Sequence, residues 1–248
     1  HTRKDSPNSS HSEIDTFLKK SHVSSKSEVE SFLSKVNSLT EPFPLENKGR
    51  LIFGMDATAS RESSWDKACH LQSEMFTETL ALGGLEVQLA YYRGFGQFHA
   101  TQWISKTDHL LQEMTNVKCA GGQTQIEKLL EQALKETKIR RVQALVFIGD
   151  AFEEDIDVIC HYAGKLGALG VRTFCFQEGN DPIAKSGFQQ IARLTNGAYS
   201  AFDSNSINQL KELLKAVAVY AAGGLKKLEA YSKVNTGAAL KLTNQMKK

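Results

Sequence analysis

The chain has 248 residues, of which 41% are hydrophobic, which is enough for one α/β domain with extensions. Its 30 Lys and Arg against 28 Asp and Glu leave a formal net charge of +2, and this balance argues against a nucleic-acid-binding surface, which needs clustered basic residues. No apolar run approaches the roughly 18 residues of a membrane span, so the sequence predicts no membrane span.

The first 45 residues differ in composition from the rest of the chain. They are rich in serine, and Pro42 and Pro44 close the segment. Ser27 and Glu30 form a capping-box pattern before apolar residues at helical spacing. We therefore expect residues 1–45 to be a short helical N-terminal extension. Packing of this extension on the main domain is the preferred interpretation, and a partner-binding arm is the alternative.

From residue 46 onward, stretches of strand character alternate with stretches of helical periodicity. The predicted strands cover residues 51–55, 86–92, 98–104, 142–148, 171–176 and 198–202. The predicted helices cover residues 65–80, 108–114, 126–134, 156–169, 188–194 and 207–221. This alternation is typical of an open, Rossmann-like α/β fold with a mainly parallel six-stranded sheet and helices on both faces. The second and third strands are joined too tightly for a helical crossover, so the third should be an antiparallel edge strand.

We place the main domain at residues 46–224 and interpret residues 225–248 as a lysine-rich C-terminal tail. The lysines of this tail, against the single acid Glu229, are Lys226, Lys227, Lys233, Lys241, Lys247 and Lys248. We expect the tail to be solvated and partly disordered. A weak contact with an acidic partner is the alternative.

The four cysteines do not form a Cys-x-x-Cys pair, and their spacing is irregular. This pattern favours neither a zinc site nor a disulfide framework. Cys175 lies in an apolar strand and Cys69 on the apolar stripe of a helix, as expected for buried free thiols. The cysteines therefore favour a reducing compartment, and we expect a cytoplasmic protein.

The candidate binding residues follow predicted strands, because open parallel sheets bind ligands outside the carboxyl ends of their strands. Asp56, Thr58 and Ser60 follow the first strand, and Asp150 follows the fourth. Thr124 comes between them in the chain, after a pair of glycines. If the first and fourth strands are neighbours, two carboxylates and three hydroxyls meet around one point.

Two buried carboxylates so close together repel each other unless one is protonated or a cation lies between them. All the offered ligands are hard oxygens, with no histidine or thiolate, so the set suits Mg²⁺ or Mn²⁺ rather than Zn²⁺. Short hydroxyl side chains leave room for water, and an open coordination position can take a carboxylate from another molecule. The sequence therefore predicts a divalent-cation site at this edge of the sheet.

The order Asp56-x-Thr58-x-Ser60, then Thr124, then Asp150 resembles the metal-ion-dependent adhesion site of von Willebrand factor A (VWA) domains. The family pattern is D-x-S-x-S followed by a Thr and an Asp. The resemblance implies the VWA fold, with Thr58, Ser60 and Thr124 holding Mg²⁺ or Mn²⁺ through hydroxyls. Asp56 and Asp150 would bind the metal directly or through water.

The same resemblance, which covers about residues 49–222, implies a protein-binding module and not an enzyme. A Glu or Asp of a partner protein would complete the metal shell, and by family analogy an AAA+ ATPase is one class of partner. Two positions depart from the family pattern. Thr58 replaces the commoner Ser but keeps the hydroxyl, and Ala151 stands where a Gly often follows the last Asp.

Some neighbouring residues allow two interpretations. Glu153, Glu154 and Asp155 either form an acidic rim around the metal or are the solvated start of a helix, where the helix dipole favours acids. Arg61, Glu62 and Trp65 are candidates for the partner-facing surface, although Trp65 fits the core better because it begins an apolar stripe. For Tyr91, Tyr92 and Arg93, which end the second strand near the same edge of the sheet, structural packing is the preferred interpretation.

Two other functions compete with a binding module. A haloacid dehalogenase-like phosphotransferase also places an Asp after the first strand and binds Mg²⁺. It needs a second Asp two residues later as general acid, and here that position is Thr58. The other alternative is a VWA scaffold whose metal site does not function.

Overall fold

The computed structural model describes residues 48–62, 84–203 and 207–247. The predicted N-terminal extension and the helix predicted at residues 65–80, with Trp65 and Cys69, lie outside the described residues. Within the described residues, no helix is long and apolar enough to cross a membrane.

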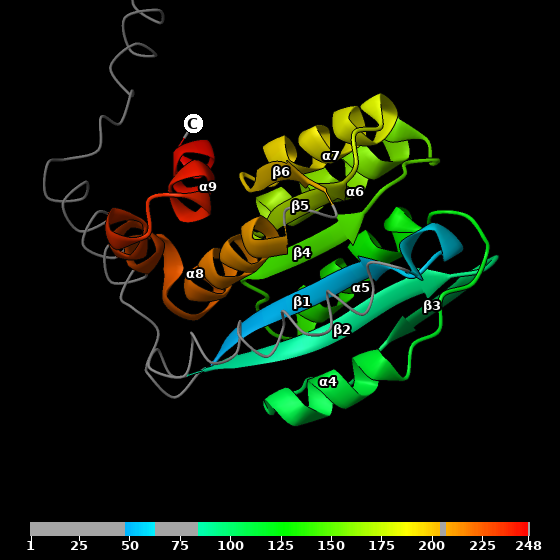
Figure 1. The fold of residues 1–248 in the computed structure, drawn as a ribbon, viewed down its shortest axis with the longest axis horizontal. Helices are drawn as coiled ribbons and strands as arrows, with labels where there is room; N and C mark the ends of the chain where they lie inside the picture. Colours follow the sequence, from blue (N-terminus) through cyan, green and yellow to red (C-terminus); the bar gives the residue numbers. More distant parts are fainter. Residues whose placement is uncertain (1–47, 63–83, 204–206, 248) are drawn as a thin grey trace, which may run out of the picture. The chain divides into compact units, whose positions relative to one another are not determined.

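A six-stranded sheet forms the centre of the described domain, with the strand order β3-β2-β1-β4-β5-β6 (Figure 1). The strands are β1 (Gly49–Asp56), β2 (Leu85–Arg93), β3 (Gln97–Ala100), β4 (Ala144–Gly149), β5 (Arg172–Glu178) and β6 (Ala198–Phe202). Neighbouring strands are parallel except β2 and β3, which form an antiparallel pair at one edge. The predicted fold class is confirmed, including the antiparallel edge strand.

The third strand is shorter than its sequence pattern predicted. It ends at Ala100, and Ile104 makes only an isolated bridge with Val87 of β2. The reason lies in Thr101, whose hydroxyl accepts a hydrogen bond from Leu89 N at 3.1 Å and donates one to Gln102 O at 2.8 Å. The Thr101 side chain thus takes a backbone hydrogen bond of β2 that a strand carbonyl would otherwise accept, and the chain leaves the sheet after this residue.

Helices cover both faces of the sheet, so its central strands are buried on both sides (Figure 1). The helices are α4 (Thr107–Thr115), α5 (Ile126–Ile139), α6 (Ile156–Ala168), α7 (Pro182–Leu194), α8 (Ile207–Val234) and α9 (Ala238–Met246). Phe53 packs in one core with α4, α8 and α9, while its neighbour Ile52 packs in the other with α5, α6 and α7. This alternation follows from the two-residue repeat of a strand.

The expectation of a solvated C-terminal tail is wrong. Helix α8 continues beyond its kink at Gly224 to Val234, and α9 follows it. Leu228 and Leu242 are both fully buried in the core that α8 shares with the sheet. Lysines alternate with apolar residues at helical spacing here, so the basic composition concealed one apolar face on each segment.

Candidate metal centre

The two aspartates of the predicted metal set lie at the carboxyl ends of adjacent strands. Strands β1 and β4 are paired in parallel, with Met55 opposite Ile148. Asp56 is the last residue of β1, and Asp150 directly follows β4. The first and fourth predicted strands are therefore neighbours, as is required for the two carboxylates to lie close together.

Asp56 is fully buried and accepts two hydrogen bonds. Thr58 N donates to Oδ1 at 2.7 Å, and the Tyr92 hydroxyl donates to Oδ2 at 3.1 Å. Burial raises the pKa of Asp56 and the negative charge of Asp150 raises it further, whereas the hydrogen bonds from Thr58 and the Arg61 guanidinium lower it. A cation between Asp56 and Asp150 would favour the ionised form of both.

The hydroxyls of Thr58 and Ser60 lie side by side above the end of β1. Their oxygens are 3.1 Å apart, and either can donate to the other. Thr58 is buried and Ser60 is exposed, so this pair runs from the interior to the surface. A short 3₁₀ turn at Ala59–Arg61 produces this arrangement.

Thr124 lies at the start of α5, and its hydroxyl is occupied by the segment that follows Asp150. The hydroxyl donates to Glu154 Oε2 at 2.6 Å and accepts from Glu153 N at 3.1 Å. The Glu153 carboxylate accepts from Thr124 N at 2.8 Å, and the Glu154 carboxylate accepts from Ile126 N. Thr124 could ligate a metal only through its remaining lone pair.

These contacts revise the interpretation of Glu153 and Glu154. Their carboxylates bind backbone amides at the amino end of α5, beside the candidate ligand Thr124. It is Asp155 that starts α6, where its side chain accepts a hydrogen bond from Asp157 N at 2.8 Å. Free amides at a helix start attract carboxylates from anywhere that the fold brings near. The sequence indicated the charge of these residues but not the helix to which they bind.

Three connecting segments are joined by backbone hydrogen bonds at this edge of the sheet: the segment after β1, the β2–β3 turn and the loop between α4 and α5. Ala57 N donates to Tyr92 O at 2.9 Å, and Ala120 N donates to Ala57 O at 3.1 Å. Gln123 N donates to Gly94 O at 3.3 Å, so the glycine pair packs on the turn between β2 and β3. A Cβ atom on Gly122 would overlap the Gly94 carbonyl, which explains why glycine is needed at that position.

Two charged residues near the aspartates were not assigned to the site from sequence. Arg61 is 1% exposed and forms an ion pair with Glu178, at the end of β5. Burial lowers the pKa of Arg61, while the charges of Asp150 and Asp56 raise it. The suggestion that Arg61 shapes the partner-facing surface is therefore wrong, because its side chain lies beneath that surface.

The donor set fits a hard divalent cation. Asp150 Oδ1 is buried, and no residue that the structure describes donates a hydrogen bond to it. A buried carboxylate oxygen without a donor is costly, which makes it a position where a cation would be stabilising. Across the described ranges, no group of three or more His, Cys, Asp and Glu side chains could hold a metal. The hydroxyls of Thr58, Ser60 and Thr124 would have to complete the shell.

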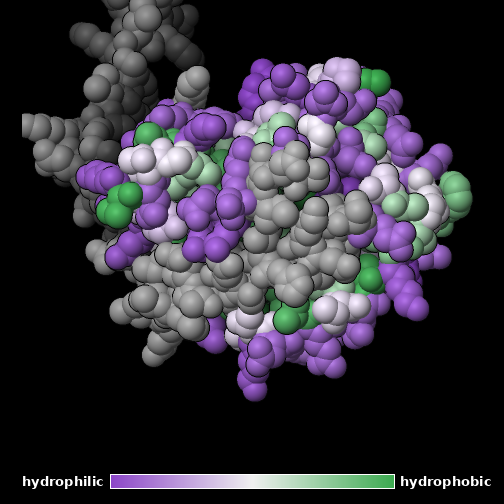
Figure 2. Space-filling view, viewed as in Figure 1, coloured by the Kyte–Doolittle hydropathy of each residue, from purple (hydrophilic) through white to green (hydrophobic). Residues whose placement is uncertain are grey.

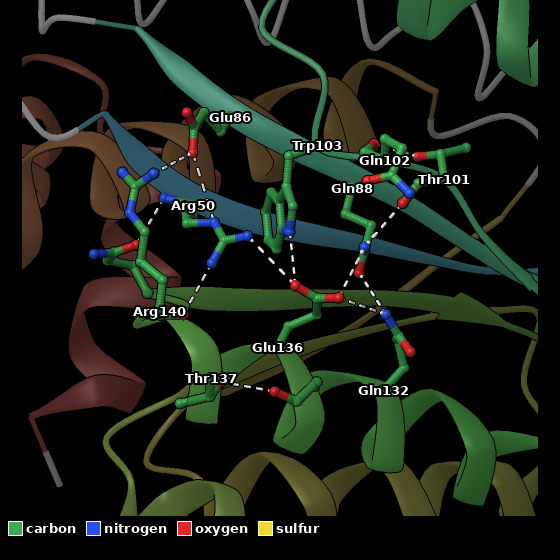
Figure 3. Close-up of polar contacts among 12 residues, drawn as sticks. Arg50, Glu86, Gln88, Thr101, Gln102, Trp103, Gln132, Glu136, Thr137 and Arg140 are labelled. Carbon is green, nitrogen blue, oxygen red and sulfur yellow. Dashed lines mark hydrogen bonds and ion pairs between the residues drawn. The ribbon is translucent and has the colours of Figure 1, made fainter.

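A second polar cluster lies at the opposite, amino end of the sheet, around Glu136 of α5 (Figure 3). Trp103 Nε1 donates to Glu136 at 2.8 Å, and the Arg50 guanidinium lies 3.5 Å above the centre of the Trp103 ring. Arg50 is buried and also contacts Glu86, with Nε and Oε2 3.6 Å apart. These carboxylates are already bound by donors of the chain itself, so the cluster is a structural connection and not a candidate ligand site.

No protein-family model matches the chain, and no curated protein matches it. Solved structures do resemble it. The VWA domain of SpRpn10 superposes with a TM-score of 0.54 at 13% identity, covering 72% of this chain and 98% of that one. Proximal thread matrix protein 1 from the mussel byssus, with a zinc-occupied MIDAS motif, gives a TM-score of 0.56 at 15% identity and covers 70% of this chain and 46% of that one.

The pilus adhesin SpaC from Lactobacillus rhamnosus GG, in an open conformation, gives a TM-score of 0.57 at 9% identity and covers 73% of this chain and 31% of that one. At such low identity these likenesses concern the fold. Together with the strand order they show that this chain has the von Willebrand factor A fold.

Proposed function

We propose that this protein is a divalent-cation-dependent protein-binding module and not an enzyme. One observation carries the proposal: Asp150 Oδ1 is a buried carboxylate oxygen without a described donor, at the end of a strand adjacent to Asp56. Such a pair of carboxylates gains most from a cation placed between them. The VWA fold of the chain supports the same interpretation.

In this proposal Asp56, Thr58, Ser60, Thr124 and Asp150 hold Mg²⁺ or Mn²⁺. The bound cation would supply a Lewis-acidic position open to an anionic oxygen. The chain's own residues prepare that position. Thr58 N and the Tyr92 hydroxyl orient the Asp56 carboxylate, while Glu153 and Glu154 fix the loop that carries Thr124.

The proposed ligand is a Glu or Asp side chain of a partner protein, and an AAA+ ATPase is one partner class suggested by family analogy. The surface around the site has an apolar component that suits a protein partner. Figure 2 shows green and pale residues grouped at the right-hand end of the view, where β1 and β2 end in Figure 1. Phe95, in the turn after β2, is 78% exposed. The described cysteines are free thiols, and we propose a cytoplasmic location.

The proposal is tested by thermal unfolding of the native chain in excess EDTA and after addition of Mg²⁺, Mn²⁺ or Zn²⁺. The third metal is included because the mussel protein's motif is described as zinc-occupied. A ligand that binds only the folded state at a hundredfold over its Kd adds about 2.7 kcal/mol to the free energy of unfolding. We expect Mg²⁺ or Mn²⁺ to raise the Tm of the native chain.

The variant Asp150→Asn keeps the shape of the site and removes one charge. The control variant, Asp108→Asn, makes the same change at an exposed residue of α4. In EDTA the stability of Asp150→Asn is measured first, because the substitution removes both the repulsion with Asp56 and the attraction to the buried Arg61 guanidinium. Added metal should then leave its Tm unchanged, whereas Asp108→Asn should respond like the native chain. A native Tm that no metal raises at millimolar concentration would favour a scaffold with a non-functional site.

A further inference from the structure

A second surface, remote from the candidate metal centre, lies between α5 and α6. A groove of about 780 Å³ runs between these helices. Its apolar lining comes from Leu134 and Tyr162, with Ala168 and Leu169 at the far end. Both helices begin at the carboxyl edge of the sheet, so the groove leads away from that edge. The main domain therefore carries an apolar depression on its outer helical layer.

Three lysines surround this apolar lining: Lys135 and Lys138 on α5, and Lys165 on α6. All three are exposed, and within the described part of the chain none of them lies in an ion pair. The Lys165 ammonium lies 5.5 Å from the centre of the Tyr162 ring, which directs it over the groove. The groove thus presents positive charge on both of its sides.

The charge is also distributed unevenly along the groove. Glu131 lines the end nearer the candidate metal centre, one helical turn before Lys135. Its carboxylate accepts a hydrogen bond from the Tyr162 hydroxyl at 2.8 Å, which ties α5 to α6 at that level. A ligand lying along the groove would therefore meet one acid at its first end and three lysines farther along.

The kind of ligand follows from the order of these features. Lysines near a helix carboxyl end suit the helix dipole by themselves, so charge alone would not identify a ligand. Here Leu169, at the carboxyl end of α6, lines the same groove and is 47% exposed. A small inorganic anion would leave this apolar surface uncovered, whereas a helix with an apolar stripe flanked by acids would cover both features. The groove extends over about two turns of each helix, which matches a short helical segment.

We propose that the groove between α5 and α6 binds an acidic amphipathic helix of a partner protein. The apolar stripe of that helix covers Tyr162, Ala168 and Leu169, and its acidic side chains pair with Lys135, Lys138 and Lys165. This surface contains none of the candidate metal ligands. Its binding is therefore independent of divalent cations and separate from the proposed function of the metal centre.

The test uses the full chain and a synthetic helical peptide with leucines at helical spacing flanked by glutamates. Peptide binding is followed by fluorescence anisotropy in excess EDTA. The comparison peptide has lysine at every glutamate position, and a third probe is a vesicle containing phosphatidylserine. We expect the acidic peptide to bind, the basic peptide not to bind, and higher salt to weaken the interaction.

Two variants locate the binding. Lys135→Glu/Lys165→Glu should lower the affinity for the acidic peptide by about tenfold or more, because two attractive contacts become repulsive. Lys185→Glu/Lys241→Glu makes the same change in net charge on exposed residues of α7 and α9 and should bind like the native chain. Leu169→Asn tests the apolar lining without adding a charge and should also weaken binding.

The proposal is overturned if the native chain does not bind the acidic peptide at millimolar concentration. Equal loss of binding in both double variants would also overturn it, because the interaction would then depend on net charge alone. Binding of the vesicle but not of the peptide would instead identify a lipid-binding surface. Thermal unfolding of each variant confirms that the fold is retained.

Discussion

At the scale of single residues, Glu136 connects parts of the chain that are far apart in sequence. Its carboxylate accepts hydrogen bonds from Trp103 at 2.8 Å, Gln132 at 3.1 Å and Gln88 at 3.4 Å. It also faces the buried guanidinium of Arg50, whose Nη2 is 3.4 Å away. Without Glu136, Arg50 would lose one of the two carboxylates that balance its charge.

We expect Glu136→Ala to lower the free energy of unfolding by about 2–4 kcal/mol, since it leaves buried donors without an acceptor. Glu136→Gln is the matched variant, because its amide oxygen still accepts from Trp103 while its charge is gone. It should cost less than Glu136→Ala. Urea unfolding monitored by tryptophan fluorescence measures both values. If the free energies of unfolding of both variants lay within about 0.5 kcal/mol of the native value, a stabilising role for this cluster would be contradicted.

Tyr162 provides a pH-dependent measurement in the α5–α6 groove. Its hydrogen bond to Glu131 raises the pKa of Tyr162 to about 12, from an ordinary value of 10.0. The folded-state pKa is raised, so the stabilising contribution of this hydrogen bond is complete below pH 10 and is lost as the pH rises through about 12.

The absorbance of tyrosinate, taken as the difference between the native chain and Tyr162→Phe, reports this titration. Glu131→Gln should move the pKa of Tyr162 down toward 10.0, because the negative acceptor is removed. An unchanged titration in that variant would mean that another group raises the pKa.

The sequence predicts the position of a residue well when its place directly after a strand is enough to locate it in the fold. Asp56 and Asp150 each follow an apolar strand, and adjacent parallel strands bring their ends together. For Tyr92 the predicted packing is confirmed, since the side chain is fully buried in the core. The hydrogen bond of its hydroxyl to an aspartate 36 positions away was not predicted, because this contact depends on the register of β1 against β2. Prediction failed for Arg61, since no sequence pattern indicates that an arginine beside exposed Ser60 is buried.

At the scale of secondary-structure elements, the loops around the candidate metal centre depend on one close approach. The glycine pair before Thr124 packs on the β2–β3 turn, and a Cβ on Gly122 would overlap the Gly94 carbonyl. A Cβ on its neighbour Gly121 would meet no atom of the described residues within 4 Å. The two glycines therefore differ in the space that a methyl group would find.

We expect Gly122→Ala to lower the free energy of unfolding by about 2–3 kcal/mol, because the backbone must move to relieve the overlap. It should also reduce any rise in Tm caused by Mg²⁺, since the same loop carries Thr124. Gly121→Ala is the control and should stay within about 0.5 kcal/mol of the native chain. Urea unfolding with and without metal measures both effects. Equal behaviour of the two variants would show that this loop accommodates a methyl group at either position.

Helix α5 shows which elements the sequence predicts well. Its predicted apolar stripe, the residues Ile126, Leu129, Leu130, Ala133 and Leu134, is also its set of buried residues. Periodicity identifies such a helix because one face packs on the sheet along its whole length. The two C-terminal helical segments were missed because Gly223-Gly224 resembles a helix end and frequent lysines resemble a solvated tail.

At the scale of the whole molecule, the C-terminal segments help to complete the domain. Helix α9 lies beside edge strand β6 (Figure 1). The Gln245 side chain accepts from Tyr199 N at 2.9 Å and donates to Tyr199 O at 3.0 Å. One amide side chain thus takes the place of a neighbouring strand and satisfies an exposed sheet edge. Lys247 closes the end of the segment in an ion pair with Glu229 at 3.0 Å.

If these segments belong to the domain, a cavity in α9 must destabilise the whole fold. Leu242 is fully buried in the core between the sheet and the C-terminal helices, whereas its neighbour Lys241 is exposed. We expect Leu242→Ala to lower the global free energy of unfolding by about 2–5 kcal/mol in urea. Lys241→Ala should change it by less than about 0.5 kcal/mol. Should the two variants unfold at the same urea concentration as the native chain, α9 would not be part of the cooperative unit, and the domain would end near Gly224.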